Sequence, residues 1–97
     1  MDIKIIGEHI EITEAIENYI KNKFAHLPKL EKMQFAEFRL GKNGNNQQHV
    51  KFSANCNHKN ITVDVSEDTA YHAIDQLMKK LHVTFTKFKE SHSEHKI

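Results

Sequence analysis

The sequence predicts an α+β fold: a two-layer β-α-β-β-β-α sandwich whose four-stranded mixed sheet carries two parallel helices on one face. Three observations lead to this fold. Four short segments alternate apolar and polar residues, which is typical of half-buried strands. Two longer segments repeat apolar residues every three or four positions, as amphipathic helices do. The first strand–helix–strand connection is expected to be right-handed, which makes the first two strands parallel.

The first half of the fold begins with a strand at residues 2–7, where isoleucines alternate with polar residues. A helix follows, with Thr13 as its N-cap and two glutamates in its first turns, where acids suit the helix dipole. This helix is expected to end near Leu27, because Pro28 disfavours helical geometry in the residue before it. Its apolar stripe consists of Ile16, Ile20, Phe24 and Leu27.

Three further strands are predicted at residues 34–40, 49–54 and 61–65, each with apolar residues at alternate positions. The polar segment 41–48, which contains two glycines, is expected to be the first connecting loop. Residues 55–60 are expected to form the second turn. The three strands should therefore pair as two antiparallel hairpins.

A second, longer helix should begin after Ser66 as its N-cap and end near Glu90. One ribbon of its surface is apolar, and residues 91–97 are expected to be a flexible tail. Residues 1–90 should then form a single domain. The apolar stripe of this helix consists of Ala70, Ile74, Leu77, Leu81, Phe85 and Phe88.

Composition restricts the class of protein. The chain has 97 residues, with 38% hydrophobic and 28% charged residues, which indicates one globular domain. No apolar run approaches the roughly 20 residues that span a bilayer, and the first residues lack a signal peptide's apolar segment. The single cysteine, Cys56, fits a reducing cytoplasm. The formal net charge is only +1, so any nucleic-acid site must arise from how charge is distributed.

Charge is ordered along both predicted helices, with acids first and lysines later. Because parallel helices place both basic halves at the same end of the domain, we expect a positive pole opposite an acidic one. Compensation of the helix dipoles explains part of this order, at about 0.3–1 kcal/mol per residue. It does not explain why Lys79 and Lys80 are adjacent and well before the helix end. The basic residues expected at the pole are Lys21, Lys23, Lys29, Lys79, Lys80, Lys87 and Lys89.

Lys23 is unusual because it projects close to the middle of the first helix's apolar stripe, roughly 20° from Ile16. Its stem is expected to be largely buried, with the ammonium reaching water in the groove between the helices. A charge held there could bind a phosphate. Two parallel helices with converging basic ends also suit double-stranded RNA, which is bound mainly through its shape, phosphates and 2′-hydroxyls.

Two segments carry a family resemblance: "GEHIEITEAIENYIKNKFAHL" at the first helix, and "AYHAIDQLMKKL" followed by "TKFK" at the second. They resemble the short ribosome hibernation promoting factors and the ribosome-associated inhibitor, which belong to the sigma-54 modulation protein family. The resemblance extends from Met1 to about Lys89. It implies a fold related in shape to double-stranded-RNA-binding domains.

The resemblance also implies a function. Such proteins bind rRNA of the small ribosomal subunit, in the channel that mRNA and tRNAs occupy, and silence translation in stationary phase or stress. Short members favour pairing of idle ribosomes with help from a second factor, whereas the inhibitor branch has a longer tail and opposes pairing. This chain resembles the short promoting type. We expect a cytoplasmic protein, monomeric in isolation, with no membrane partner.

The resemblance implies roles for individual residues. His26 lies where the family commonly has a lysine, and Val83 and Thr84 lie where it often has an Arg-Gln pair. Lys79, beside Lys80, compensates in part for the positive charge that is missing there. The residues that match basic positions of the family's helices are Lys23, Lys80, Lys87 and Lys89.

Other types of site find little support. Eight histidines raise the possibility of a metal site, but no His, Cys and acid cluster has metal-site spacing, so no metal or cofactor is expected. Cys56 close to His58 could suggest a nucleophile, but the sequence indicates no third group that would orient such a pair, and a cysteine in a turn is more often inert. Tyr71 and Asp75, four residues apart, are expected to form a local hydrogen-bonded pair. An enzyme is therefore not expected, and no catalytic residue is assigned.

The alternative is a protein-interaction module that uses the exposed sheet face or the acidic pole, with lysines that only aid solubility. Salt dependence separates the two hypotheses. Phosphate binding weakens steeply as salt rises, whereas binding through an apolar protein interface does not.

Overall fold

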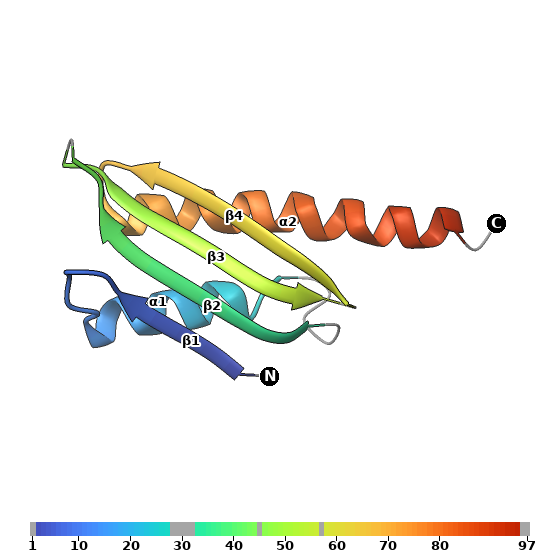
Figure 1. Ribbon diagram of the computed structural model, residues 1–97, viewed down its shortest axis with the longest axis horizontal. Coiled ribbons are helices and arrows are strands. Elements are labelled where there is room, and N and C mark those ends of the chain that lie inside the picture. The colour runs from blue at the N-terminus through green and yellow to red at the C-terminus, as the bar shows by residue number, and fades with distance from the viewer. Residues whose placement is uncertain (1, 28–32, 45, 57, 96–97) are drawn as a thin grey trace.

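Four strands and two helices form two layers, with both helices on the same face of the sheet (Figure 1). The computed structural model describes residues 2–27, 33–44, 46–56 and 58–95, and side chains up to residue 86. The elements are β1 (Asp2–Gly7), α1 (Glu14–Phe24), β2 (Met33–Lys42), β3 (Gln48–Cys56), β4 (Lys59–Glu67) and α2 (Ala70–His95).

The sheet has the strand order β1-β2-β3-β4. β1 pairs in parallel with β2, whereas β2–β3 and β3–β4 are antiparallel hairpins. Figure 1 shows α1 and α2 running in the same direction behind the sheet. The predicted fold class and the parallel arrangement of the helices are therefore confirmed.

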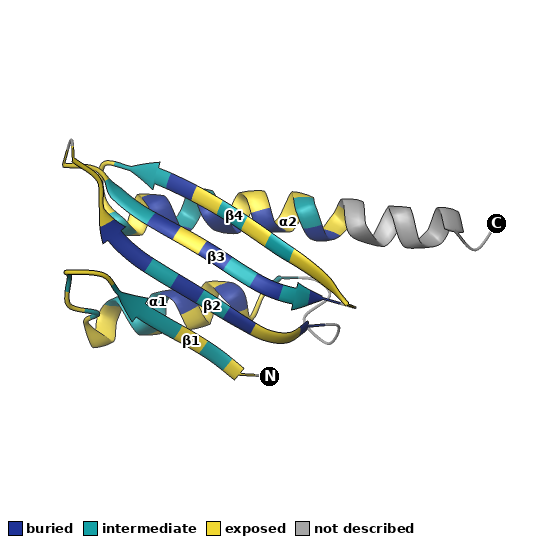
Figure 2. Ribbon diagram, in the orientation of Figure 1, coloured by how far each residue is buried: buried dark blue, intermediate teal, exposed yellow. Residues whose placement is uncertain are grey.

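Aromatic side chains from both layers meet at the centre of the core. Phe24 of α1 packs edge-on against Phe38 of β2, with ring centroids 5.3 Å apart and planes at 88°. Phe52 of β3 completes the cluster at 5.1 Å from Phe38 and 5.8 Å from Phe24. Figure 2 shows the buried and exposed residues that alternate along β2, β3 and β4, as the period of two predicts.

α1 begins as predicted but ends earlier. The Thr13 hydroxyl accepts a hydrogen bond of 3.2 Å from the Ile16 N–H, which is an N-cap contact. The helix ends at Phe24 rather than near Leu27. The N–H groups of His26 and Leu27 bond to carbonyls three residues back, so the last turn tightens into a non-α geometry.

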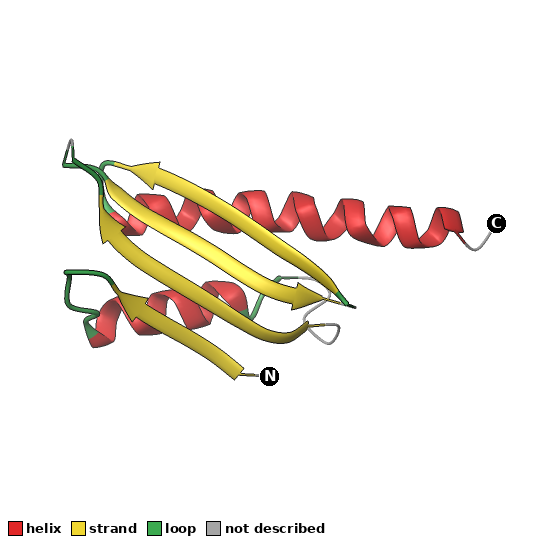
Figure 3. Ribbon diagram, viewed as in Figure 1, coloured by secondary structure: helices red, strands yellow, loops and turns green. Residues whose placement is uncertain are grey.

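α2 differs from the prediction at both ends. Ser66 is not its N-cap, because Ser66 and Glu67 belong to β4. Thr69 caps the helix instead, since its hydroxyl accepts from the His72 N–H at 3.1 Å. The helix continues to His95, past its expected end near Glu90, and extends beyond the sheet (Figure 3). The flexibility expected of residues 91–97 stays a prediction.

The strands are longer and their connections shorter than the sequence pattern predicts. β2 extends to Lys42, which lies opposite Gln48 of β3, so both ends of the expected loop 41–48 belong to the ladder and the connection is residues 43–47. β4 begins at Lys59, within the expected turn 55–60. Cross-strand pairing therefore extends both hairpins past the alternating segments. In the part of the chain described above, no helix combines the length and apolar character needed to cross a membrane.

Candidate nucleic-acid interface

A groove of about 620 Å³ lies between the end of α1 and the middle of α2. It exists because residues of α2 spaced three and four apart form one helix face, which is turned toward α1. Lys23 and Lys79 contribute the two ammonium groups of its lining, one from each helix. The groove is lined by Lys23, His26, Leu27, His72, Asp75, Gln76, Met78, Lys79 and His82.

Lys23 reaches this groove, but its stem is not buried as expected. The side chain keeps 48% of its surface exposed. Its ammonium lies 3.8 Å from the Asp75 carboxylate of α2 and 5.4 Å from the centre of the Tyr19 ring. These contacts span the two helices, so the ammonium is held at the groove by a carboxylate and an aromatic face rather than by apolar packing.

Asp75 pairs across the helices, whereas the sequence pattern predicts a pair with Tyr71. The Tyr19 hydroxyl donates a hydrogen bond of 2.6 Å to the Asp75 carboxylate. This bond, with burial and the nearby negative charge, raises the pKa of Tyr19. Tyr71 instead packs edge-on against the Tyr19 ring, with centroids 4.9 Å apart. The Tyr19–Asp75–Lys23 network therefore fixes the spacing of α1 and α2 beside the groove.

His26 and Lys79 complete the basic part of the groove. The His26 Nδ1 lies 2.8 Å from the Asn22 carbonyl oxygen, which can only accept, so Nδ1 carries a proton. Its other ring nitrogen, Nε2, is left to interact with a ligand. Lys79 is exposed on the face of α2 that turns toward Lys23. The groove thus offers two ammonium groups and the His26 imidazole to an anion, and α2 adds the imidazoles of His72 and His82 to its lining.

The other predicted basic residues do not line this groove. Lys80 faces the β4 side of α2, where it lines an apolar notch of about 380 Å³ with Val63 and Val83. Lys21 lies 4.0 Å from Glu17, an exposed pair on one helix whose contribution to stability is small. The remaining three predicted residues, Lys29, Lys87 and Lys89, have side chains outside the described part of the structure.

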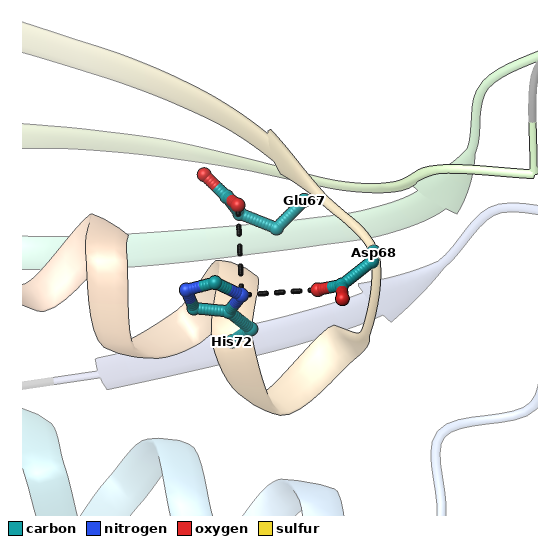
Figure 4. A group of neighbouring side chains, drawn as sticks. All are labelled: Glu67, Asp68 and His72. Carbon is teal, nitrogen blue, oxygen red and sulfur yellow. Dashed lines mark hydrogen bonds and ion pairs between the residues drawn. The ribbon is translucent and has the colours of Figure 1, made fainter.

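The acidic end of the molecule holds a cluster that the sequence spacing did not reveal (Figure 4). Glu67, Asp68 and His72 offer ligand atoms within 4.8 Å of one another, because the β4–α2 turn folds the acids back onto the helix. The His72 Nδ1 lies 3.0 Å from Asp68 and 3.6 Å from Glu67. Hydrogen bonding to Asp68 raises the pKa of His72 and lowers that of Asp68. The two carboxylates therefore favour the protonated imidazole.

The outer face of the sheet carries charges that pair with one another. Arg39 of β2 lies 3.2 Å from Glu37 and 3.6 Å from Glu8. His49 and Asp64, on neighbouring strands, are 3.0 Å apart. Such a face is well solvated and offers no concentrated charge of one sign to a partner.

Known proteins share this geometry and the sequence that produces it. A sequence profile described as "Sigma 54 modulation protein / S30EA ribosomal protein" matches residues 3–93. The chain belongs to this family. The match covers both helices and the whole sheet, so the S30EA family assignment rests on the entire fold and not on one motif.

Solved structures agree with the S30EA assignment. A ribosomal subunit interface protein from Coxiella burnetii superposes with a TM-score of 0.87 at 20% identity, covering 93% of this chain and 99% of that chain. The N-terminal domain of Protein Y from Thermus thermophilus superposes with a TM-score of 0.80 at 27% identity, covering 91% and 99%. The comparison with curated proteins gives no match. The family is one of ribosome-associated proteins and not of enzymes.

Proposed function

We propose that this protein is a ribosome hibernation factor that binds rRNA in the decoding channel of the small ribosomal subunit. Bound there, it blocks mRNA and tRNA and silences translation in stationary phase or stress. The observation that carries the proposal is the α1–α2 groove, in which Lys23 and Lys79 present ammonium groups from two parallel helices. Membership of the S30EA family gives the ribosome as the partner.

A protein can bind RNA through phosphate and shape contacts, without contacts that depend on the base sequence. Phosphate contacts from lysines give affinity and release counterions. A folded rRNA surface is recognised by shape and by its backbone, which needs positive groups on a rigid scaffold. The two helices are rigid elements whose spacing is fixed by the Tyr19–Asp75 hydrogen bond and the Tyr19–Tyr71 contact. They therefore hold the ammonium groups in place before RNA arrives.

The site extends along α2 in this proposal. Lys80, on the β4 side, widens the basic surface. Lys21 and His26 belong to the α1 side of the proposed site. Lys29, Lys87 and Lys89 are further members of the proposed RNA-binding set, on the basis of the sequence alone. The protein acts in the cytoplasm, where it is a monomer before binding. It favours ribosome dimerisation together with a second factor, as a short promoting member would.

The alternative, a protein-interaction module, gains no support from the sheet. The outer face carries mutually paired charges, including Arg39 with Glu37 and His49 with Asp64. A stable protein interface has an apolar, desolvated core. Of the exposed large apolar residues of the described chain, Phe35 lies on β2, whereas Tyr71 and Val83 lie about three turns apart on α2, so they form no such core.

Sedimentation with purified small ribosomal subunits tests the proposal. The protein should co-sediment, and mRNA with initiator tRNA should displace it. If about four phosphates are contacted, the log–log dependence of affinity on salt should have a slope on the order of −3 to −4, taking roughly 0.7–0.9 per phosphate. Failure to co-sediment at low salt, or binding that salt does not weaken, would exclude the rRNA-binding proposal.

A further inference from the structure

The α1–α2 groove contains three imidazoles, which phosphate binding by lysines does not require. His26 comes from the end of α1, and His72 and His82 come from α2. All three residues are exposed. Histidine is the side chain whose charge changes most readily between pH 5 and 8, so this groove can vary its charge over the physiological range.

His72 is not suited to control binding of an anion, because its charge is already compensated. Asp68 and Glu67 lie within salt-bridge distance of its Nδ1, and Asp75 also acts on it. The positive charge of protonated His72 is therefore balanced by these carboxylates, and it adds little attraction for a phosphate.

His26 and His82 lie beside the lysines instead. Among the described side chains, neither forms an ion pair with a carboxylate. In neutral His26 the Nδ1 proton is directed to the Asn22 carbonyl, so Nε2 carries a lone pair that repels a phosphate oxygen. Protonation converts Nε2 into a charged donor. His82 follows Lys79 by three residues on the same helix face, so its charge would add to that of the lysine.

We propose that His26 and His82 make rRNA binding by this groove pH-dependent, so that affinity rises as the pH falls below neutrality. The inference rests on the proposed function, because the anion is rRNA phosphate. The charged groups facing the two imidazoles are Lys23 from α1 and Asp75, Lys79 and His72 from α2. The charge of His72 is balanced by its neighbouring acids and is not counted. Lys23, Lys79 and Asp75 together give the groove a charge of roughly +1, which becomes roughly +3 when His26 and His82 are both protonated.

The size of the effect follows from the charge that each imidazole adds. A protonated imidazole donates a charge-assisted hydrogen bond to a phosphate, which is stronger than any contact of the neutral ring, so each should tighten binding roughly sixfold between pH 8 and pH 6. Two such groups together give on the order of 30-fold. The low-pH form would therefore hold the subunit when the cell acidifies and release it when neutrality returns.

The test measures the dissociation constant for purified small ribosomal subunits at pH 8 and pH 6, at fixed ionic strength and magnesium. The double variant His26→Gln, His82→Gln removes both imidazoles but keeps polar side chains at exposed positions. His49→Gln is the matched control, because His49 lies on the outer sheet face and pairs with Asp64. Circular dichroism at both pH values checks that each variant is folded.

The parent and His49→Gln should bind on the order of 30-fold more tightly at pH 6, whereas the double variant should change by less than about twofold. A double variant that keeps the parent's pH dependence would overturn the inference, as would a parent whose binding is the same at both pH values. Those results leave rRNA binding itself intact. Absence of binding by the parent at either pH would overturn both the inference and the proposed function.

Discussion

Lys23 shows how one residue of the interface is held without being buried. Its ammonium lies 3.8 Å from Asp75 and 5.4 Å from the Tyr19 ring centre, while half of the side chain stays in water. An exposed ion pair of this kind contributes little to stability, because solvent screens it. Its main effect is to keep a positive charge at the groove.

Replacing Lys23 with methionine should separate these roles. Lys23→Met keeps the length of the stem and removes the charge, so the midpoint of thermal unfolding should stay the same or rise. Binding to the small subunit should weaken by roughly tenfold, since the variant has one ammonium fewer to bind a phosphate. Thermal melts and subunit co-sedimentation measure the two effects. If neither changes, Lys23 is only a packing residue of α1.

His72 should make stability depend on pH. Its pKa is raised above 6.5 by Asp68, so the folded state binds the proton more tightly than the unfolded state. This contribution is fully present below about pH 6.5 and is lost as the pH rises through the folded-state pKa. Asp68 has a pKa lowered from its ordinary value of 3.8. Its ionised form therefore stabilises the folded state above about pH 3.8, and this stabilisation is lost as the pH falls through the folded-state pKa.

The variant His72→Gln should therefore lower the unfolding temperature near pH 5.5 and leave it almost unchanged near pH 8.5. Differential scanning calorimetry of the parent and the variant at both pH values measures this. An equal loss at the two pH values would show that His72 contributes by packing and not through its charge.

At the scale of the elements, the start of α2 decides where the second half of the interface lies. Thr69 caps this helix through the His72 N–H, whereas Ser66 ends a strand and its hydroxyl accepts from the Asn43 side chain at 2.8 Å. Two hydroxyl residues three positions apart, separated by two acids, are equally good N-cap candidates from sequence. The length of β4, which is set by pairing with β3, selects the later one.

Removal of the two hydroxyls should reveal this difference. Thr69→Ala should lower the free energy of unfolding by about 1 kcal/mol, since it removes a helix N-cap. Ser66→Ala should cost less than about 0.5 kcal/mol, because the hydroxyl of the partly exposed Ser66 makes only a solvent-exposed hydrogen bond with Asn43. Urea unfolding of both variants measures the two losses. A larger loss for Ser66→Ala than for Thr69→Ala would show that Ser66 is the N-cap.

At the scale of the whole molecule, periodicity and connection rules were sufficient to predict the topology. The alternation in three strands and the right-handed crossover fix the parallel helices, and these bring Lys23 and Lys79 to one groove. The partners of Lys23 could not be predicted in the same way. Tyr19 and Asp75 are 56 residues apart, and only the packing angle between the helices determines which side chains meet.

The groove histidines could not be predicted as a group either. The resemblance gave His26 a role because of the lysine that the family has there, but His82 has no such signal. Residues 26 and 82 become neighbours only when α1 and α2 pack side by side. The register of two helices is set by core side chains on their buried faces, so the contents of the groove are a property of the folded molecule.

In the proposed function, the lysines of α2 bind the ribosome. The triple variant Lys79→Glu, Lys80→Glu, Lys87→Glu reverses that surface at positions outside the apolar stripe, so it should stay folded. A control variant, Lys4→Glu, Lys42→Glu, Lys51→Glu, makes the same change of net charge on the strands of the sheet, where these residues are exposed. Circular dichroism verifies that both are folded.

The decisive measurement is co-sedimentation of the parent and both variants with purified small ribosomal subunits, together with inhibition of cell-free translation. The parent and the control should bind and inhibit, whereas the α2 variant should lose both activities. A folded α2 variant that binds and inhibits like the parent would rule out rRNA binding through these lysines, which would then be only a solvated face of the protein.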